Sequence, residues 1–149
     1  GLILLAPAPP GQLAGVQPLP TVPIGKPVPP PDPETSHRRF FPNHRREDSD
    51  ALWARLVPES PTLLNDRRRL NVRIARTRIS GPVLLIAAGR DDGAMHTYGQ
   101  DYETARSYDA EYHFVEDAGH CFMLEPDWER EARIIRRWLL SNFAVGSRK

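Results

Sequence analysis

The sequence predicts an α/β fold with about three parallel strands and flanking helices. The first observation behind this is the run PVLLIAAG, residues 82–89, which is almost continuously apolar and has the length of a strand. Such a run is typical of a parallel strand that is covered on both faces. The second is the alternation of strand-like and helix-like patterns that follows it. With 149 residues, 26% of them charged, the chain is long enough for one domain with a core.

Composition and charge indicate which kinds of molecule the protein is not expected to bind. A net charge of +1 gives no general reason to expect a nucleic acid or an anionic membrane surface, and the arginine clusters are interspersed with acidic residues. No run is apolar and long enough to span a bilayer. The single cysteine, Cys121, excludes an intramolecular disulfide and a multi-cysteine zinc site, so we expect a reducing, cytoplasmic location.

The first expected strand, residues 2–5, leads into a proline-rich stretch. Most of the 16 prolines lie between Pro7 and Pro42, which excludes a helix interior or a full sheet ladder there. Two interpretations stay open: a disordered linker, or a loop that covers the core like a lid, with scattered apolar residues binding the surface beneath.

Two amphipathic helices are expected next. One begins at an N-cap, either Asp48 or Ser49, and ends before Pro58. The other lies within residues 63–79, where apolar residues recur at helical spacing, and ends before the Gly81-Pro82 step.

After the strand at 82–89, the pattern predicts a helix over 98–110, a strand over 111–117 and an amphipathic helix over 127–143. In the strand we expect Tyr112 and Phe114 to point inward. An apolar stripe is expected to pack the last helix against the core; it comprises Trp128, Ile135, Trp138 and Leu139.

Polar side chains follow the last two expected strands. The sequence GRDDG follows the first of these strands and EDAGH follows the second, so both loops are expected at the same rim of a parallel sheet. Asp92 and His120 are then candidates for an acid–base pair. A carboxylate bound to one imidazole nitrogen fixes the tautomer and stabilises the imidazolium that forms when the other nitrogen takes a proton.

These stretches resemble the α/β-hydrolase family. The stretch GPVLLIAAGRDDG resembles the strand and turn that carry the family's acid, and VEDAGHCFMLEPDWE resembles its histidine loop and last helix. GLILLAPAPPG is similar to the strand after the nucleophile helix, and RLVPESP to lid segments of esterase-like and lysophospholipase-like members. The resemblance implies the carboxyl-terminal part of the fold: a core formed by residues 1–6 and 79–149, and a lid or cap over 7–78.

The resemblance also implies roles for particular residues. The acid falls on Asp92, three residues after the glycine that ends the strand, with Asp91 as its close rival. The base falls on His120, and Glu125 matches an acidic position for which we expect a structural role. The family's Gly-x-Ser-x-Gly nucleophile elbow is absent from these 149 residues.

Two functions remain open at this point. The first is the acid- and base-bearing half of a serine hydrolase that acts on small carboxylic esters, inactive alone and completed by a missing amino-terminal half or a second chain. The second is a noncatalytic, truncated or degenerate hydrolase module that binds a partner or small ligand. We expect no cofactor, no nucleic acid partner and no metal, because Asp91, Asp92 and His96 lack a recognised ligand spacing. Cys121 is expected to be a small buried residue rather than a nucleophile.

Overall fold

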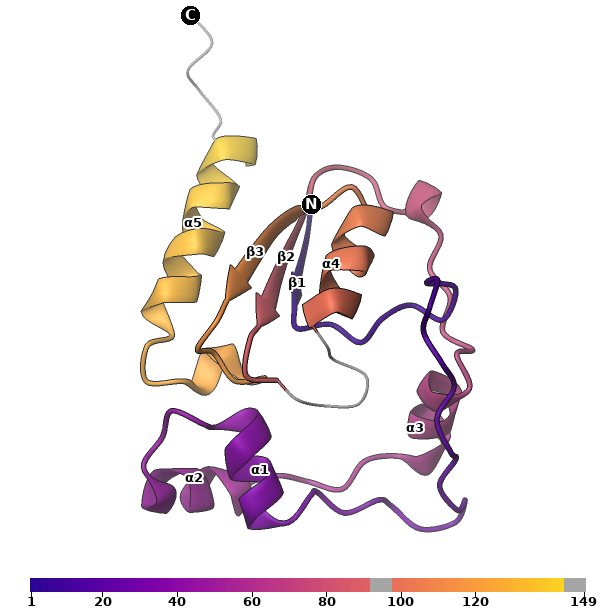
Figure 1. The fold of residues 1–149 in the computed structure, drawn as a ribbon, viewed down its shortest axis with the longest axis vertical. Coiled ribbons are helices and arrows are strands. Elements are labelled where there is room, and N and C mark those ends of the chain that lie inside the picture. Colours follow the sequence, from indigo (N-terminus) through magenta and orange to yellow (C-terminus); the bar gives the residue numbers. More distant parts are fainter. Residues whose placement is uncertain (92–97, 144–149) are drawn as a thin grey trace, which may run out of the picture.

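The structure is a computed structural model that describes residues 1–91 and 98–143 (Figure 1). Its centre is a sheet of three parallel strands in the order β1-β2-β3. The strands are β1 (Leu2–Leu5), β2 (Val83–Ala88) and β3 (Glu111–Val115). The predicted α/β fold and its three parallel strands are thereby confirmed.

Strand β2 is the centre of the core, and all six of its residues are buried. Its alternate side chains point to opposite faces of the sheet. Leu85 and Ala87 pack under α4 (Tyr98–Ser107). Leu84 and Ile86 pack on the other face, with Trp138 of α5 (Glu129–Phe143) (Figure 1). This two-sided cover explains why the strand is apolar without interruption.

Two expectations about inward-pointing side chains are wrong. Phe114 is 46% exposed, although it lies on the same face of β3 as the partly buried Tyr112. The apolar cluster under α4 includes Tyr112 but does not reach Phe114. In the stripe of the last helix, Trp138 is buried, but Leu139 is 42% exposed and Trp128 precedes the helix and is 50% exposed. A single helix that packs on one face of a sheet buries a narrower stripe than the expected one.

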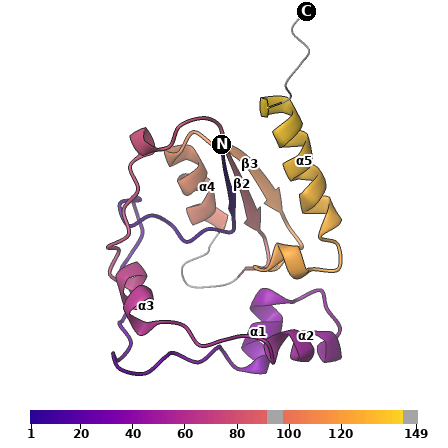
Figure 2. The ribbon, with the colours of Figure 1, turned by 180° about the vertical axis from the view of Figure 1, so that it is seen from behind.

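Residues 7–78 contain three helices: α1 (Pro33–Phe40), α2 (Arg46–Trp53) and α3 (Pro61–Arg68) (Figure 2). The prolines were expected to exclude helix as far as Pro42, which is wrong for α1. Proline is tolerated in the first turn, where its missing N–H has no intrahelical partner. Asp32 caps α1 by accepting a hydrogen bond from the backbone N–H of Thr35, at 2.8 Å.

The other helix boundaries also differ from the expected ones. The N-cap of α2 is Arg45, not Asp48 or Ser49. The single helix expected within 63–79 is α3, which ends at Arg68, followed by a short 3₁₀ turn at Arg76–Arg78. Leu70 interrupts the helix with φ +61°. The extended chain beyond it pairs with the start of the proline-rich stretch, where Gly11 N–H donates to Val72 O at 2.7 Å.

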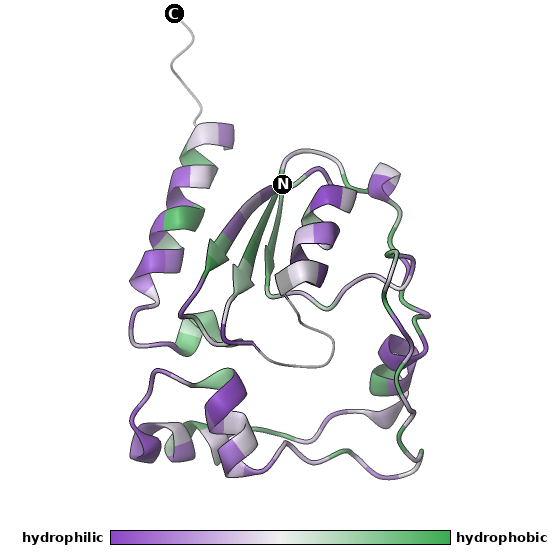
Figure 3. Ribbon diagram, viewed as in Figure 1, coloured by the Kyte–Doolittle hydropathy of each residue, from purple (hydrophilic) through white to green (hydrophobic). Residues whose placement is uncertain are grey.

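The 7–78 segment is folded against the carboxyl ends of the strands and is not a disordered linker (Figure 1). Phe41 has an exposed fraction of only 1%. Asn43 donates to the carbonyl oxygen of Asp117 at 2.8 Å. Nε2 of His44 lies 2.5 Å from the carbonyl oxygen of Leu124. Polar residues cover much of α1 and α2, and the sheet is predominantly apolar (Figure 3). Within the described residues, no helix has the length and apolar character needed to cross a membrane.

The substitution Phe41→Ala is expected to lower the free energy of unfolding by about 3 kcal/mol, because it leaves a cavity where the 7–78 segment docks. Urea unfolding followed by circular dichroism measures the loss. Phe114→Ala is the matched control, since Phe114 is 46% exposed and should cost less than about 1 kcal/mol. Equal small losses in both variants would contradict the docked arrangement.

Candidate active site

Two loops meet beyond the carboxyl ends of β2 and β3. The N–H of Gly89 donates to Val115 O at 2.8 Å, and the N–H of Arg90 donates to Ala118 O at 2.9 Å. These bonds hold the two loops together past the last residue of each strand. A side chain at position 89 has no space, because a Cβ there would lie 2.2 Å from Glu116 O. The glycine that ends the strand is therefore a requirement of the close approach.

This approach brings His120 against an acid. His120 Nδ1 lies 2.5 Å from Oδ2 of Asp91, whose side chain is completely buried. The imidazole side chain is 29% exposed. Asp92, the acid that the family resemblance implies, lies outside the described residues. In the part that the structure describes, the carboxylate beside His120 is that of the rival, Asp91.

The chemistry open to this pair depends on which group holds the shared proton. An ionised carboxylate only accepts hydrogen bonds, so when Asp91 is ionised the proton between the two groups belongs to Nδ1. Nε2 of the neutral ring is then left as the basic nitrogen. A buried carboxylate in this position also stabilises the imidazolium that forms when Nε2 takes up a proton.

The last two residues of α1 contact both His120 and Asp91. Arg39 O accepts the backbone N–H of His120 at 2.9 Å, and Arg39 Nη2 lies 3.9 Å from Asp91 Oδ1. The ring of Phe40 is tilted against the imidazole, with 5.6 Å between the ring centres. None of these three contacts was predicted, because no local pattern connects the proline-rich stretch with the histidine loop.

The glycine before His120 also has a physical reason. A Cβ at Gly119 would lie 2.3 Å from Pro42 Cδ and 2.6 Å from Glu125 Oε1. The Gly119 N–H donates to the same Glu125 oxygen at 3.2 Å. Burial raises the pKa of Glu125, and hydrogen bonds from Asn43 and Gly119 partly offset the rise. Glu125 thus supports the histidine loop, in line with the structural role expected from the sequence.

Two further candidates from the sequence are Cys121 as a nucleophile and a metal site. Burial raises the pKa of Cys121 to about 11, and the charges of Asp91 and Glu125 add to the rise. Its thiolate is scarce at neutral pH, which makes it a poor nucleophile. Among the described residues, no group of three His, Cys, Asp or Glu side chains is placed to hold a metal ion. His96 lies outside them.

Asp101 is a buried carboxyl that the sequence reasoning missed. It lies in the first turn of α4 with an exposed fraction of 1%, and within the described structure neither carboxyl oxygen has a hydrogen-bond partner. Its pKa is raised to about 7, mainly by burial and also by the charge of Asp91, with the charge of His120 acting in the opposite direction. A helical spacing of i, i+3, i+4, i+7 relates Asp101 to Thr104, Ala105 and Tyr108, which are all buried. This spacing is the sequence signal that could have placed Asp101 on the buried face of the helix.

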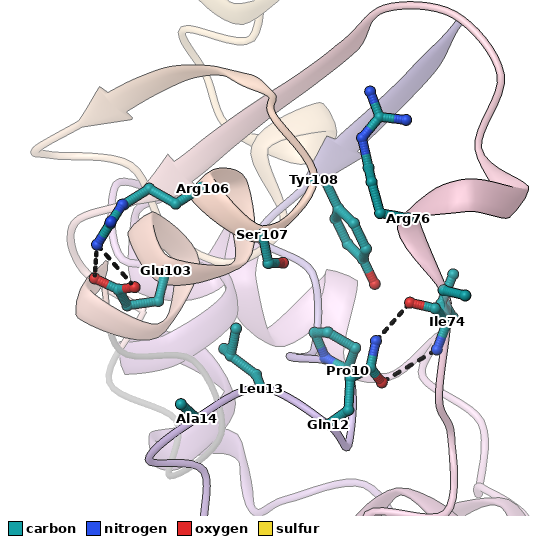
Figure 4. Close-up of a pocket in the computed structure, with 11 residues that line it drawn as sticks. Pro10, Gln12, Leu13, Ala14, Ile74, Arg76, Glu103, Arg106, Ser107 and Tyr108 are labelled. Carbon is teal, nitrogen blue, oxygen red and sulfur yellow. Dashed lines mark hydrogen bonds and ion pairs between the residues drawn. The ribbon is translucent and has the colours of Figure 1, made fainter.

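A cavity of about 530 Å³ lies between α4 and two parts of the 7–78 segment (Figure 4). The amide group of Gln12 closes one side of it through hydrogen bonds with both backbone groups of Ile74. Tyr108, which directly follows α4, points into the same region (Figure 4). The lining includes neither Asp91 nor His120, so this cavity is separate from the acid–base pair.

The chain belongs to the alpha/beta hydrolase family, whose profile matches residues 1–132. A similar solved structure is that of a methylesterase protein, MES16, from Arabidopsis, with a TM-score of 0.56 and 17% sequence identity. The likeness covers 92% of this chain but only 58% of that one, so the chain spans a little over half of its solved relative. No curated protein matches the sequence.

The substitution Gly119→Ala is expected to cost about 2 kcal/mol of stability, because its Cβ displaces Pro42 or the Glu125 carboxylate. Thermal unfolding of Gly119→Ala, Pro42→Ala and the double variant checks this. Because Pro42→Ala removes the nearest atoms, the double variant should lose less than the sum of the two single losses. If the stability losses of the two single variants are additive in the double variant, Pro42 does not clash with the Cβ at position 119.

The substitution Asp101→Asn is expected to stabilise the protein at neutral pH. The unfolded carboxyl loses its proton near pH 3.8 and the folded one only near pH 7, so the wild type loses stability as pH rises between these values. Asparagine stays neutral, so the advantage of the variant should grow over this window to about 4 kcal/mol and then stay constant.

Urea unfolding from acid to neutral pH measures this difference. Glu103→Gln is the control, since it alters an exposed carboxyl of the same helix. Stability curves of the wild type and Asp101→Asn that run parallel through the whole pH range would refute the buried, protonated state of Asp101.

Proposed function

We propose that this chain supplies the base and the acid of a serine hydrolase acting on carboxylic esters. His120 is the base, and Asp91 is the acid that orients it. The observation that carries the proposal is the 2.5 Å contact between His120 Nδ1 and the fully buried Asp91 carboxylate. Membership of the alpha/beta hydrolase family and the fold likeness to a methylesterase support the class of substrate.

In this mechanism, His120 Nε2 takes the proton of a serine hydroxyl as the oxygen attacks the ester carbonyl. The imidazolium then gives the proton to the departing alcohol, and an acyl-enzyme remains. His120 next takes a proton from water, whose oxygen attacks the acyl carbon. The imidazolium then returns a proton to the serine oxygen as the acyl–oxygen bond breaks and the carboxylic acid leaves. Asp91 stays ionised throughout and balances the charge of the imidazolium.

The nucleophile in this proposal is a serine outside these 149 residues. None of the serines in the chain lies in a Gly-x-Ser-x-Gly elbow. The family places that elbow upstream of the strand corresponding to β1, so the proposed serine comes from a preceding segment or a second chain. The 7–78 segment, folded against the rim beside His120, is the proposed lid over the ester site.

The second candidate is a noncatalytic hydrolase module that binds a partner or small ligand. The absence of the elbow from this sequence favours it. The raised pKa of Cys121 is consistent with it as well, since the neighbouring thiol offers no substitute nucleophile.

A fluorophosphonate probe, which reacts with activated serines, separates the two candidates. The protein is isolated with everything that co-purifies, and intact masses identify the labelled chain. We expect label on a serine outside residues 1–149. His120→Ala and Asp91→Asn should each slow labelling by about 10³-fold or more, because the base is lost or held in the wrong tautomer.

Asp92→Asn is the matched control, since it neutralises the neighbouring carboxylate and should leave the labelling rate almost unchanged. Slow labelling in Asp92→Asn with normal labelling in Asp91→Asn would transfer the role of the acid to Asp92. Absence of label on every chain would favour the noncatalytic module.

A further inference from the structure

The two oxygens of the Asp91 carboxylate face partners from different parts of the fold. Oδ2 lies against His120 Nδ1 at 2.5 Å, and Oδ1 lies 3.9 Å from Nη2 of Arg39. His120 follows β3, but Arg39 belongs to α1 of the 7–78 segment. The carboxylate therefore connects the core of the fold with the segment that covers its rim.

Arg39 holds the base as well as the acid. Its carbonyl oxygen accepts the backbone N–H of His120 at 2.9 Å, and the ring of the next residue, Phe40, lies against the imidazole. The guanidinium group of Arg39 lies 5.2 Å from the centre of the Phe40 ring. Two consecutive residues of α1 thus fix the backbone of His120, one face of its ring and its acid.

The ion pair between Arg39 and Asp91 differs from an ordinary surface pair. Exposed ion pairs contribute little, because water screens both charges. Here the Asp91 side chain has no exposed surface, and that of Arg39 is 24% exposed. A buried carboxylate needs compensating charge or hydrogen bonds to stay ionised. The positive charge of Arg39 favours the ionised form of Asp91. A negative charge on Asp101, which lies on α4, disfavours the ionised form of Asp91.

We propose that Arg39 is a positioning residue for the His120–Asp91 pair, through which docking of the 7–78 segment sets the orientation of the base. With Arg39 in place, the carboxylate is held from both sides and presents Oδ2 to Nδ1, which fixes the orientation of the ring and of Nε2. Without these contacts from α1, Asp91 lacks the charge of Arg39, His120 lacks a backbone hydrogen bond, and the ring gains freedom to turn. The catalytic meaning of this arrangement rests on the proposed ester hydrolase function.

The test compares the ring nitrogens of His120 by ¹⁵N NMR in the wild type, Arg39→Met and Arg39→Lys. Both substitutions keep the backbone carbonyl at position 39, so they isolate the guanidinium group. We expect the wild type to hold one neutral tautomer, with the proton on Nδ1. Arg39→Met should give a mixture of both tautomers, and Arg39→Lys, which keeps the charge, should restore much of the wild-type signal.

Arg55→Met is the matched control, because Arg55 is an exposed arginine of the same segment and should leave the spectrum unchanged. Backbone amide signals of β2 and β3 verify that each variant is folded. If Arg39→Met does not fold, Arg39→Gln, which also lacks the charge, is interpreted in the same way. A single Nδ1–H tautomer in the folded neutral variant would overturn the proposal.

The labelling reaction separates this proposal from the proposed function. If both hold, Arg39→Met slows fluorophosphonate labelling about tenfold, the size expected for losing one interaction with a charged group. A tautomer change without label on any chain keeps the role of Arg39 and rejects the hydrolase. Normal labelling with an unchanged tautomer in Arg39→Met rejects the role of Arg39 alone.

Discussion

The buried negative charge of Asp91 is the constraint on which the rest of this site depends. A carboxylate without exposed surface is stable only where partners supply opposite charge or hydrogen bonds. His120 and Arg39 do so from two separate parts of the chain, and each is brought there by a different element. The position of Asp91 follows in turn from β2, whose six buried residues anchor the strand that ends just before it.

Close packing of loops supplies the precision that this arrangement requires. Gly89 lets the loop after β2 touch the backbone of the loop after β3, and Gly119 lets Pro42 and Glu125 approach the histidine loop. Both glycines are needed for the space they leave, since a methyl group at either position would overlap neighbouring atoms. The geometry of the pair is therefore set by backbone contacts as much as by the side chains that form it.

The sequence was most informative where local patterns decide the structure. Strand β2 is recognisable because burial on both faces leaves an uninterrupted apolar run, and the Gly-His step lies in the loop whose histidine contacts Asp91. The sequence alone does not decide between Asp91 and Asp92 as the proposed acid, because the two carboxylates are neighbours in the same turn sequence. The contact from Arg39 was unpredictable, because it joins residues far apart in sequence across a helix that begins at a proline.

The most direct test of this account is a crystal structure of the chain, or of a longer protein that contains it, at a resolution that defines Asp91, Asp92 and His120. The account predicts a carboxylate oxygen of Asp91 within hydrogen-bonding distance of His120 Nδ1, and Arg39 on the other oxygen. A structure in which the Asp92 carboxylate binds Nδ1, with Asp91 turned away from the imidazole, would contradict it.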